Sequence, residues 1–94
     1  MIPVSPRNLL QHELIGLDAT VVDSTNICSI GISGRVIDET RNTLVISKMG
    51  SKKIIPKETS HFRFALPGGI QVEVDGVRII GGPENRIKGR KGVE

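Results

Sequence analysis

The sequence predicts an all-β fold: a small antiparallel barrel of five to seven strands, with a short N-terminal helix and a flexible basic C-terminal tail. From residue 17 onward, short segments rich in Val, Ile and Thr are separated by turn residues. No interval between them is long enough for the helix that a parallel crossover needs. The 94 residues, 37% of them apolar, suit one small domain with a modest core.

The first segment carries a helix start signal. Ser5 can cap the helix, Pro6 suits its first turn, and Gly16 would end it. Leu10 and Leu14 would then share one face. Because so short a helix is marginal alone, we expect residues 1–16 to form an extension that packs on a barrel spanning residues 17–81, followed by a tail over residues 82–94.

Strand-like segments follow at residues 17–24, 29–38, 43–48, 52–57 and 61–66. In the last of these, strict alternation points Phe62, Phe64 and Leu66 to one side, which predicts that they are core residues. Gly31 and Gly34 mark places where the second strand could bend sharply.

Two turns are predicted to close hairpins. An Asp75-Gly76 turn would join residues 70–74 to residues 77–80 and place Val72 opposite Ile79 and Glu73 opposite Arg78.

The other turn, Met49-Gly50, would place Val45 opposite Ile54 and Leu44 opposite Ile55, so the base of this hairpin is apolar on both faces. One face would meet the barrel interior. The other would need cover from the terminal helix, a loop or a partner protein.

Thirteen Lys and Arg against ten Asp and Glu give a net charge of +3 and a pI of about 9.4, which favours nucleic acid as a partner. The basic residues form two clusters, one around the hairpin turn and one in the tail: Lys48, Lys52 and Lys53, and Arg86, Lys88, Arg90 and Lys91. Taken alone, the first cluster could simply solvate a hairpin end and discourage edge aggregation. Two separate clusters suit a phosphate backbone better. Without Trp or Tyr, base stacking is not expected to supply the affinity, which should depend strongly on salt.

Catalytic and metal-binding motifs are not found in the sequence. His12 and His61 lack metal-ligand spacing, no GxSxG elbow or P-loop occurs, and the single Cys28 permits neither an internal disulfide nor a cysteine-based zinc site. No apolar run predicts a membrane span or a secretion signal. We therefore expect a cytoplasmic binding protein without a cofactor of its own.

Three blocks, "ELIGLDATVVDSTN", "GRVIDETRNTLVI" and "KIIPK" followed by "FRF", resemble the archaeal ribonuclease P protein component 1 family over about residues 8–90. The second block is also similar to the first motif of Sm-like RNA-binding proteins. The resemblance implies an Sm-like barrel and a noncatalytic RNA-binding subunit of ribonuclease P, the hydrolase that removes the 5′ leader from precursor tRNA. In that complex the RNA carries the active site and its magnesium ions.

The resemblance also implies partners: ribonuclease P RNA, a zinc-ribbon protein subunit and other ribonuclease P proteins. It adds Arg35 and Lys57 to the RNA-binding candidates. Asn42 and Thr43 fall in the same turn block, where turn geometry is the first explanation and RNA contact the second. The zinc-ribbon subunit would contact the N-terminal segment and part of the second strand, and the candidate residues are Leu9, Leu10, Leu14, Ile15 and Leu17.

Two other functions stay open at this point. The chain could be a protein-interaction barrel of another ribonucleoprotein, whose apolar hairpin face binds the partner while its lysines keep it in solution. It could also be an autonomous nuclease, which would cleave RNA alone in a metal-dependent reaction. Salt titration of RNA binding separates the first alternative from an RNA-binding subunit.

Overall fold

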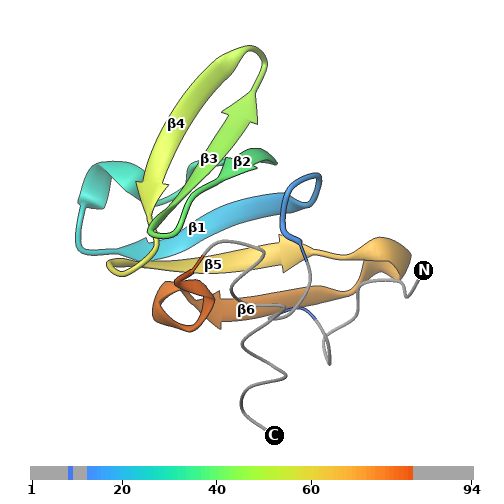
Figure 1. The fold of residues 1–94 in the computed structure, drawn as a ribbon. Helices are drawn as coiled ribbons and strands as arrows, with labels where there is room; N and C mark the ends of the chain where they lie inside the picture. The colour runs from blue at the N-terminus through green and yellow to red at the C-terminus, as the bar shows by residue number, and fades with distance from the viewer. Residues whose placement is uncertain (1–8, 10–12, 82–94) are drawn as a thin grey trace, which may run out of the picture.

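The chain is described here by a computed structural model, which covers Leu9 and residues 13–81. These residues form one six-stranded antiparallel sheet with the order β4-β3-β2-β1-β5-β6 (Figure 1). The strands are β1 (Asp18–Ser24), β2 (Ser33–Glu39), β3 (Thr43–Lys48), β4 (Ser51–Pro56), β5 (Ser60–Ala65) and β6 (Gln71–Asp75). The predicted all-β antiparallel class is confirmed. The sheet is not closed, however, because β4 and β6 are its two edges.

The predicted Asp75-Gly76 hairpin is wrong. Asp75 has a φ of −67°, whereas the expected turn needs positive φ, and its carboxylate accepts a hydrogen bond of 3.1 Å from the Val77 amide. That bond caps a 3-10 helix, η4 (Gly76–Ile79), where a strand was expected. Gly76 is needed for a different reason, since a Cβ there would overlap the carbonyl oxygen of Lys57.

Residues 76–79 therefore add no strand to the sheet. With residues 77–80 out of the strand set, no further strand follows β6 in the described part of the chain to bridge the two edges. Glu73 consequently pairs not with Arg78 but with Arg63 of β5, at 3.2 Å. Two other short 3-10 helices, η2 (Ile27–Ser29) and η3 (Pro67–Gly69), occupy connections between strands.

The N-terminal helix prediction falls largely on residues outside the described set, as do Leu10 and the tail over residues 82–94. Residues 13–16, which the prediction placed at the end of the helix, belong to a turn closed by a 3.1 Å bond from the Leu17 amide to the Leu14 carbonyl. The Gly16 amide donates to the Val36 carbonyl, so this segment is attached to β2. Within the described residues, no helix has the length and apolar character to cross a bilayer.

Alternation along the strands builds the core. Phe62 and Phe64 are 0% exposed and Leu66 is 5% exposed, as the pattern predicted. The two rings lie with centroids 6.0 Å apart. The other buried apolar residues come from every strand and from both flanking segments: Leu9, Leu14, Ala19, Val21, Val36, Leu44, Ile46, Ile55, Val74 and Ile79.

The β3–β4 hairpin forms in the predicted register, with Leu44 opposite Ile55 and Val45 opposite Ile54. Met49 and Gly50 have φ values of 52° and 83°, the left-handed conformations of a two-residue hairpin turn. The hairpin projects beyond the rest of the sheet (Figure 1). Gly34 in β2 is required near the turn end of this hairpin, because a Cβ there would overlap the carbonyl oxygen of Ser47 in β3.

Lys57 follows β4 and is completely buried. Its ammonium donates to Glu39 Oε2 at 2.8 Å and to the carbonyl oxygens of Thr40 at 2.8 Å and Gly81 at 3.0 Å. The side chains of Lys57 and Glu39 are both 0% exposed. Lys57 therefore cannot present its charge to RNA in this structure, and its assignment as an RNA-binding residue is corrected. The "KIIPK" block instead carries an internal ion pair.

This ion pair joins three separate parts of the chain. Glu39 ends β2, Lys57 follows β4, and Gly81 is the last described residue. The Gly81 amide also donates to the Arg41 carbonyl at 2.7 Å. Both polar backbone groups of Gly81 are thus bonded at this one site, which fixes where the chain leaves the sheet.

Replacing Lys57 with Met should lower the free energy of unfolding by about 3–5 kcal/mol, because it leaves the Glu39 carboxylate buried without its cation. Lys57→Met combined with Glu39→Met should lose much less, since no lone charge is buried. Urea unfolding measures both. The exposed Lys53→Met is the control and should stay within about 0.5 kcal/mol of the original chain. An equal effect of Lys57→Met and Lys53→Met would contradict the role given to this ion pair.

Candidate nucleic-acid interface

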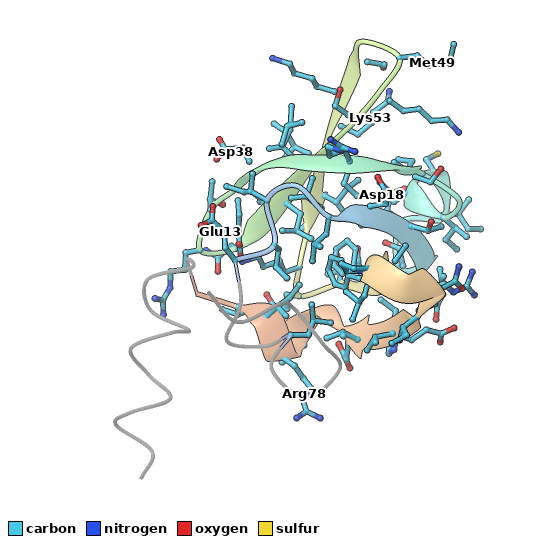
Figure 2. All side chains as sticks on the ribbon, turned by 90° about the vertical axis from the view of Figure 1, so that its right-hand side faces the viewer. Glu13, Asp18, Asp38, Met49, Lys53 and Arg78 are labelled. Atoms are coloured by element: carbon cyan, nitrogen blue, oxygen red, sulfur yellow. The ribbon has the colours of Figure 1, made fainter. Side chains whose placement is uncertain are left out.

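The hairpin lysines lie on two sides of the β3–β4 ribbon. The register pairs Ile46 with Lys53, Ser47 with Lys52 and Lys48 with Ser51. Because side chains alternate along a strand, Lys48 and Lys53 lie on the side of buried Ile46. Lys52 lies on the opposite side. All three lysines are exposed near the hairpin end, which Met49 marks in Figure 2.

Arg35 belongs to the Lys52 side of the ribbon. In the ladder it faces Ser47, which in turn faces Lys52. Arg35 lies 3.9 Å from Asp18, and both side chains are 66% exposed. An ion pair so exposed contributes little and is screened by salt, so Arg35 can exchange Asp18 for a phosphate at small cost.

No carboxylate of the described residues forms an ion pair with a hairpin lysine. The ion pairs there use Asp18, Glu39 and Glu73, and none of them involves a hairpin lysine. In the part of the chain that the structure describes, Lys48, Lys52 and Lys53 are exposed, and none has a carboxylate within ion-pair distance.

The other half of the sheet has the opposite charge. Asp23 on β1, His61 on β5 and Asp75 on β6 are aligned across the strands, and with Glu58 they line a polar hollow of about 370 Å³. No group of three or more His, Cys, Asp or Glu side chains in the described residues is arranged to hold a metal ion. Three carboxylates here repel phosphate, whereas the β3–β4 end attracts it.

Neither Phe ring is exposed for stacking on a base. The chain contains two Phe and no Trp or Tyr, and both Phe rings are fully buried. Stacking on a Phe ring therefore cannot contribute to an RNA contact of this sheet.

The residues predicted to bind a protein partner are divided between core and surface. Leu9 and Leu14 are 1% and 0% exposed and belong to the chain's own core, so their assignment as partner contacts is corrected. Leu17 packs partly buried against that core, and Ile15 is 39% exposed.

The predicted second apolar face of the hairpin is present, and two of its side chains are exposed. Ile54 is 69% exposed and Ile37, the extra residue of a bulge in β2, is 38% exposed. Val45 lies between them in the ladder. We call Ile37, Val45 and Ile54 the outer apolar face.

Thr43 has the local bonding role that the sequence favoured, whereas Asn42 does not have the left-handed backbone expected of it. The Thr43 amide donates to Thr40 Oγ1 at 3.1 Å, and the two hydroxyls lie 2.6 Å apart. The Asn42 carbonyl accepts from the Lys57 amide at 2.8 Å. These residues hold the β2–β3 turn in place.

Arg86, Lys88, Arg90 and Lys91 lie outside the described residues, so their assignment stays a prediction. Sequence reasoning missed a pocket beside the hairpin, between the tip and the segment that enters β2, which Ile32 and Ser33 help to line. The sequence alone does not show this pocket, because its lining residues come from two separate segments, 31–33 and 46–53. Only the strand register places the two segments together.

Comparisons with known proteins agree on one family. The profile described as Ribonuclease P/MRP, subunit p29, matches residues 7–89. Ribonuclease P protein component 1 of Methanocaldococcus jannaschii is 51% identical over 86 residues, covering 90% of each chain. That of Thermofilum pendens is 47% identical over 88 residues, covering 93% of this chain and 94% of the relative.

A solved structure described as a homologue of the human RNase P protein Rpp29 superimposes with a TM-score of 0.60 at 47% identity. The match covers 81% of this chain and 99% of that one. On both sequence and fold, the chain belongs to the p29 family of ribonuclease P protein subunits.

Proposed function

We propose that this ribonuclease P subunit is noncatalytic and binds structured RNA through the hairpin cations Lys48, Lys52 and Lys53, together with Arg35. The observation that carries the proposal is the projection of three exposed lysines, without a carboxylate partner among the described residues, at one end of the sheet. Arg86, Lys88, Arg90 and Lys91 would extend the same contact.

The proposed mechanism is electrostatic. Folding RNA brings phosphates together, and cations fixed on a rigid ribbon reduce their repulsion and release condensed counterions. The acidic half of the sheet would face away from the RNA. In this proposal the RNA removes the 5′ leader of precursor tRNA and binds the magnesium, while the protein stabilises the active RNA fold. The close approach of β3 at Gly34, followed along the chain by the Thr40–Asn42 turn, supports an Sm-like ancestry for the sheet.

Another surface supports a protein contact within the same complex. The outer apolar face is exposed beside Ile15, whose neighbour Gly16 is bonded to β2. We propose that this face and the Ile15–Leu17 segment bind the zinc-ribbon protein subunit, in place of the buried Leu9 and Leu14.

Replacing Lys52 and Lys53 with Gln should weaken binding to ribonuclease P RNA about tenfold at 0.15 M salt, since two exposed charge contacts of about 0.7 kcal/mol each are lost. The slope of log K against log salt should become less steep by roughly 1.5 to 2. Fluorescence anisotropy over a salt series measures both quantities.

The matched control is Arg63→Gln with Arg78→Gln, which removes the same net charge from exposed or half-buried sites outside the hairpin, on β5 and η4. It should leave the slope almost unchanged. Equal effects of the two double variants would show that only net charge matters. If binding by the original chain does not respond to salt, the protein-interaction module becomes the better account.

Ile54→Lys should abolish binding to the zinc-ribbon subunit and leave the fold intact, because this side chain is 69% exposed. Isothermal titration calorimetry measures the binding. Val77→Lys, at a 53% exposed position on η4, is the control. Undiminished binding by Ile54→Lys would remove the outer apolar face from the proposed interface.

A further inference from the structure

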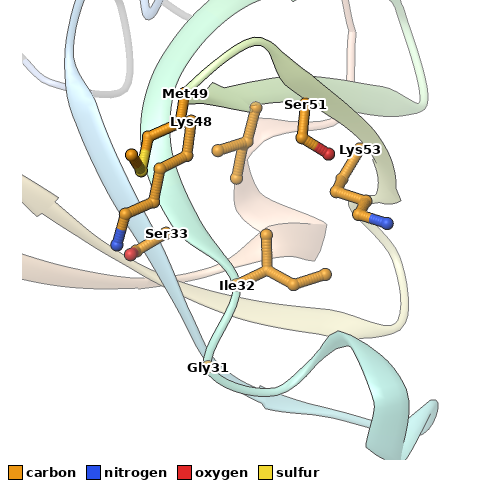
Figure 3. A pocket seen from close by; sticks show the side chains of 8 residues that line it. Gly31, Ile32, Ser33, Lys48, Met49, Ser51 and Lys53 are labelled. Carbon is orange, nitrogen blue, oxygen red and sulfur yellow. The ribbon is translucent and has the colours of Figure 1, made fainter.

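A pocket of about 320 Å³ lies between the β3–β4 hairpin and the segment that leads into β2. Ile32 and Ile46 supply its apolar surface, together with Met49 at the hairpin tip. Figure 3 shows Lys48 and Met49 on one side and Ser51 and Lys53 on the other, with Ile32 between them. The pocket is therefore apolar at its base and basic on both sides.

The register explains why the pocket is open. The β2–β3 ladder has its first pair at Arg35 and Ser47, so Lys48 and the turn extend past the last strand partner. Ile46 is covered because β2 pairs with β3 at that level. Nearer the tip, the same side of the hairpin has no neighbouring strand and is exposed. Gly34 allows β2 and β3 to approach closely just below this point.

Met49 is an unusual residue for its position. It is 97% exposed and has a φ of 52°, a conformation that Gly, Asn or Asp adopts more cheaply in a two-residue turn. The left-handed backbone costs a β-carbon residue about 1 kcal/mol. A large apolar side chain held there in solvent suggests a binding contact.

We infer that this pocket binds one unpaired nucleotide of the RNA, an inference that rests on the proposed function. The base would lie against Ile32, Ile46 and Met49. Lys48 and Lys53 would contact the phosphates on its 5′ and 3′ sides, and the hydroxyls of Ser33 and Ser51 would bond to the base edge or the ribose.

Charge complementarity selects this occupant. A nucleotide within a chain carries a phosphate on each side of its base, which matches an apolar pocket with a lysine on each side. A protein segment would match the pocket only if an acidic residue stood on each side of an apolar one, whereas every nucleotide within an RNA chain has this arrangement of charge. The volume falls within the usual range for small-ligand sites, about 300–1,000 Å³.

The inference also refines the prediction that bases contribute little to affinity. No aromatic ring is available for stacking, so the base is held by aliphatic contact. Aliphatic contact holds a base less tightly than an aromatic stack does, so the preference for a base should be modest.

The test uses two RNA hairpins, one with a single bulged adenosine and one with an abasic ribose at the same position. The full chain, labelled with carbon-13 at its Ile and Met methyl groups, is titrated with each. The bulged adenosine should shift the methyl signals of Ile32 and Met49 and bind about fivefold more tightly than the abasic RNA.

A substitution that fills the pocket tests the same inference in the protein, and a matched substitution elsewhere is its control. Ser51→Leu adds apolar volume at the rim without changing charge, and Gln71→Leu makes a similar change at the first residue of the opposite edge strand. Ser51→Leu should remove the preference for adenosine while keeping the salt dependence, whereas Gln71→Leu should keep both.

The possible outcomes separate this inference from the proposed function. Equal affinity for the two RNAs, with the Ile32 and Met49 signals unmoved, would overturn the nucleotide pocket and leave phosphate binding standing. Loss of salt-dependent binding to both RNAs would overturn the proposed function and the pocket together. Methyl shifts produced by the zinc-ribbon subunit and not by RNA would assign the pocket to a protein and refute the inference.

Discussion

The two-residue turn at Met49 and Gly50 fixes the register of β3 against β4, and the proposed RNA contacts depend on that register. A slip of β4 by one residue against β3 would turn Ile55 from the core to solvent, a loss of burial of about 1.5–3 kcal/mol, and would turn Ile54 inward in its place. The same slip would exchange the sides occupied by Lys52 and Lys53. Core packing at the base of the hairpin therefore determines which cations face the pocket and which lie beside Arg35.

Burial separates lysines that stabilise the fold from lysines that can bind a ligand. Lys57 gives its whole hydrogen-bonding capacity to Glu39 and nearby carbonyl groups. An isolated charge at that site would be very unfavourable, so its position is tightly specified. Lys48, Lys52 and Lys53 lie on the exposed ribbon, where water solvates each ammonium until a phosphate replaces it. A buried lysine thus stabilises the fold, and exposed lysines only a few positions away are available to bind a ligand.

Local pattern predicted the features that depend on neighbours in sequence. The apolar spacing on both sides of Met49 and Gly50 was enough to predict the hairpin and its register, and alternation was enough to place both Phe rings in the core. The two basic clusters were also evident, although the charge pattern could not show on which side of the ribbon each lysine lies.

Features that depend on distant segments were missed. Asp75 and Gly76 suit a tight hairpin turn locally, but Gly76 packs against the backbone after β4, and Asp75 caps η4 instead. Lys57 looked like a surface cation because its partners Glu39 and Gly81 are 18 and 24 residues away. Leu9 and Leu14 matched a partner surface for the same reason: only the folded sheet shows that it buries them. The nucleotide pocket likewise needs residues 31–33 to meet the hairpin tip.

Site-directed cleavage of ribonuclease P RNA gives the most direct test of the central claim, that the hairpin end of the sheet faces RNA. An iron chelate that generates hydroxyl radicals would be attached at a single cysteine, Ser51→Cys or Arg78→Cys, in a chain where the one native cysteine is replaced by Cys28→Ser. Met49, close to the first site, and Arg78 mark opposite ends of the molecule in Figure 2. The account predicts localised RNA cleavage from position 51 and little from position 78; cleavage from position 78 alone would contradict it.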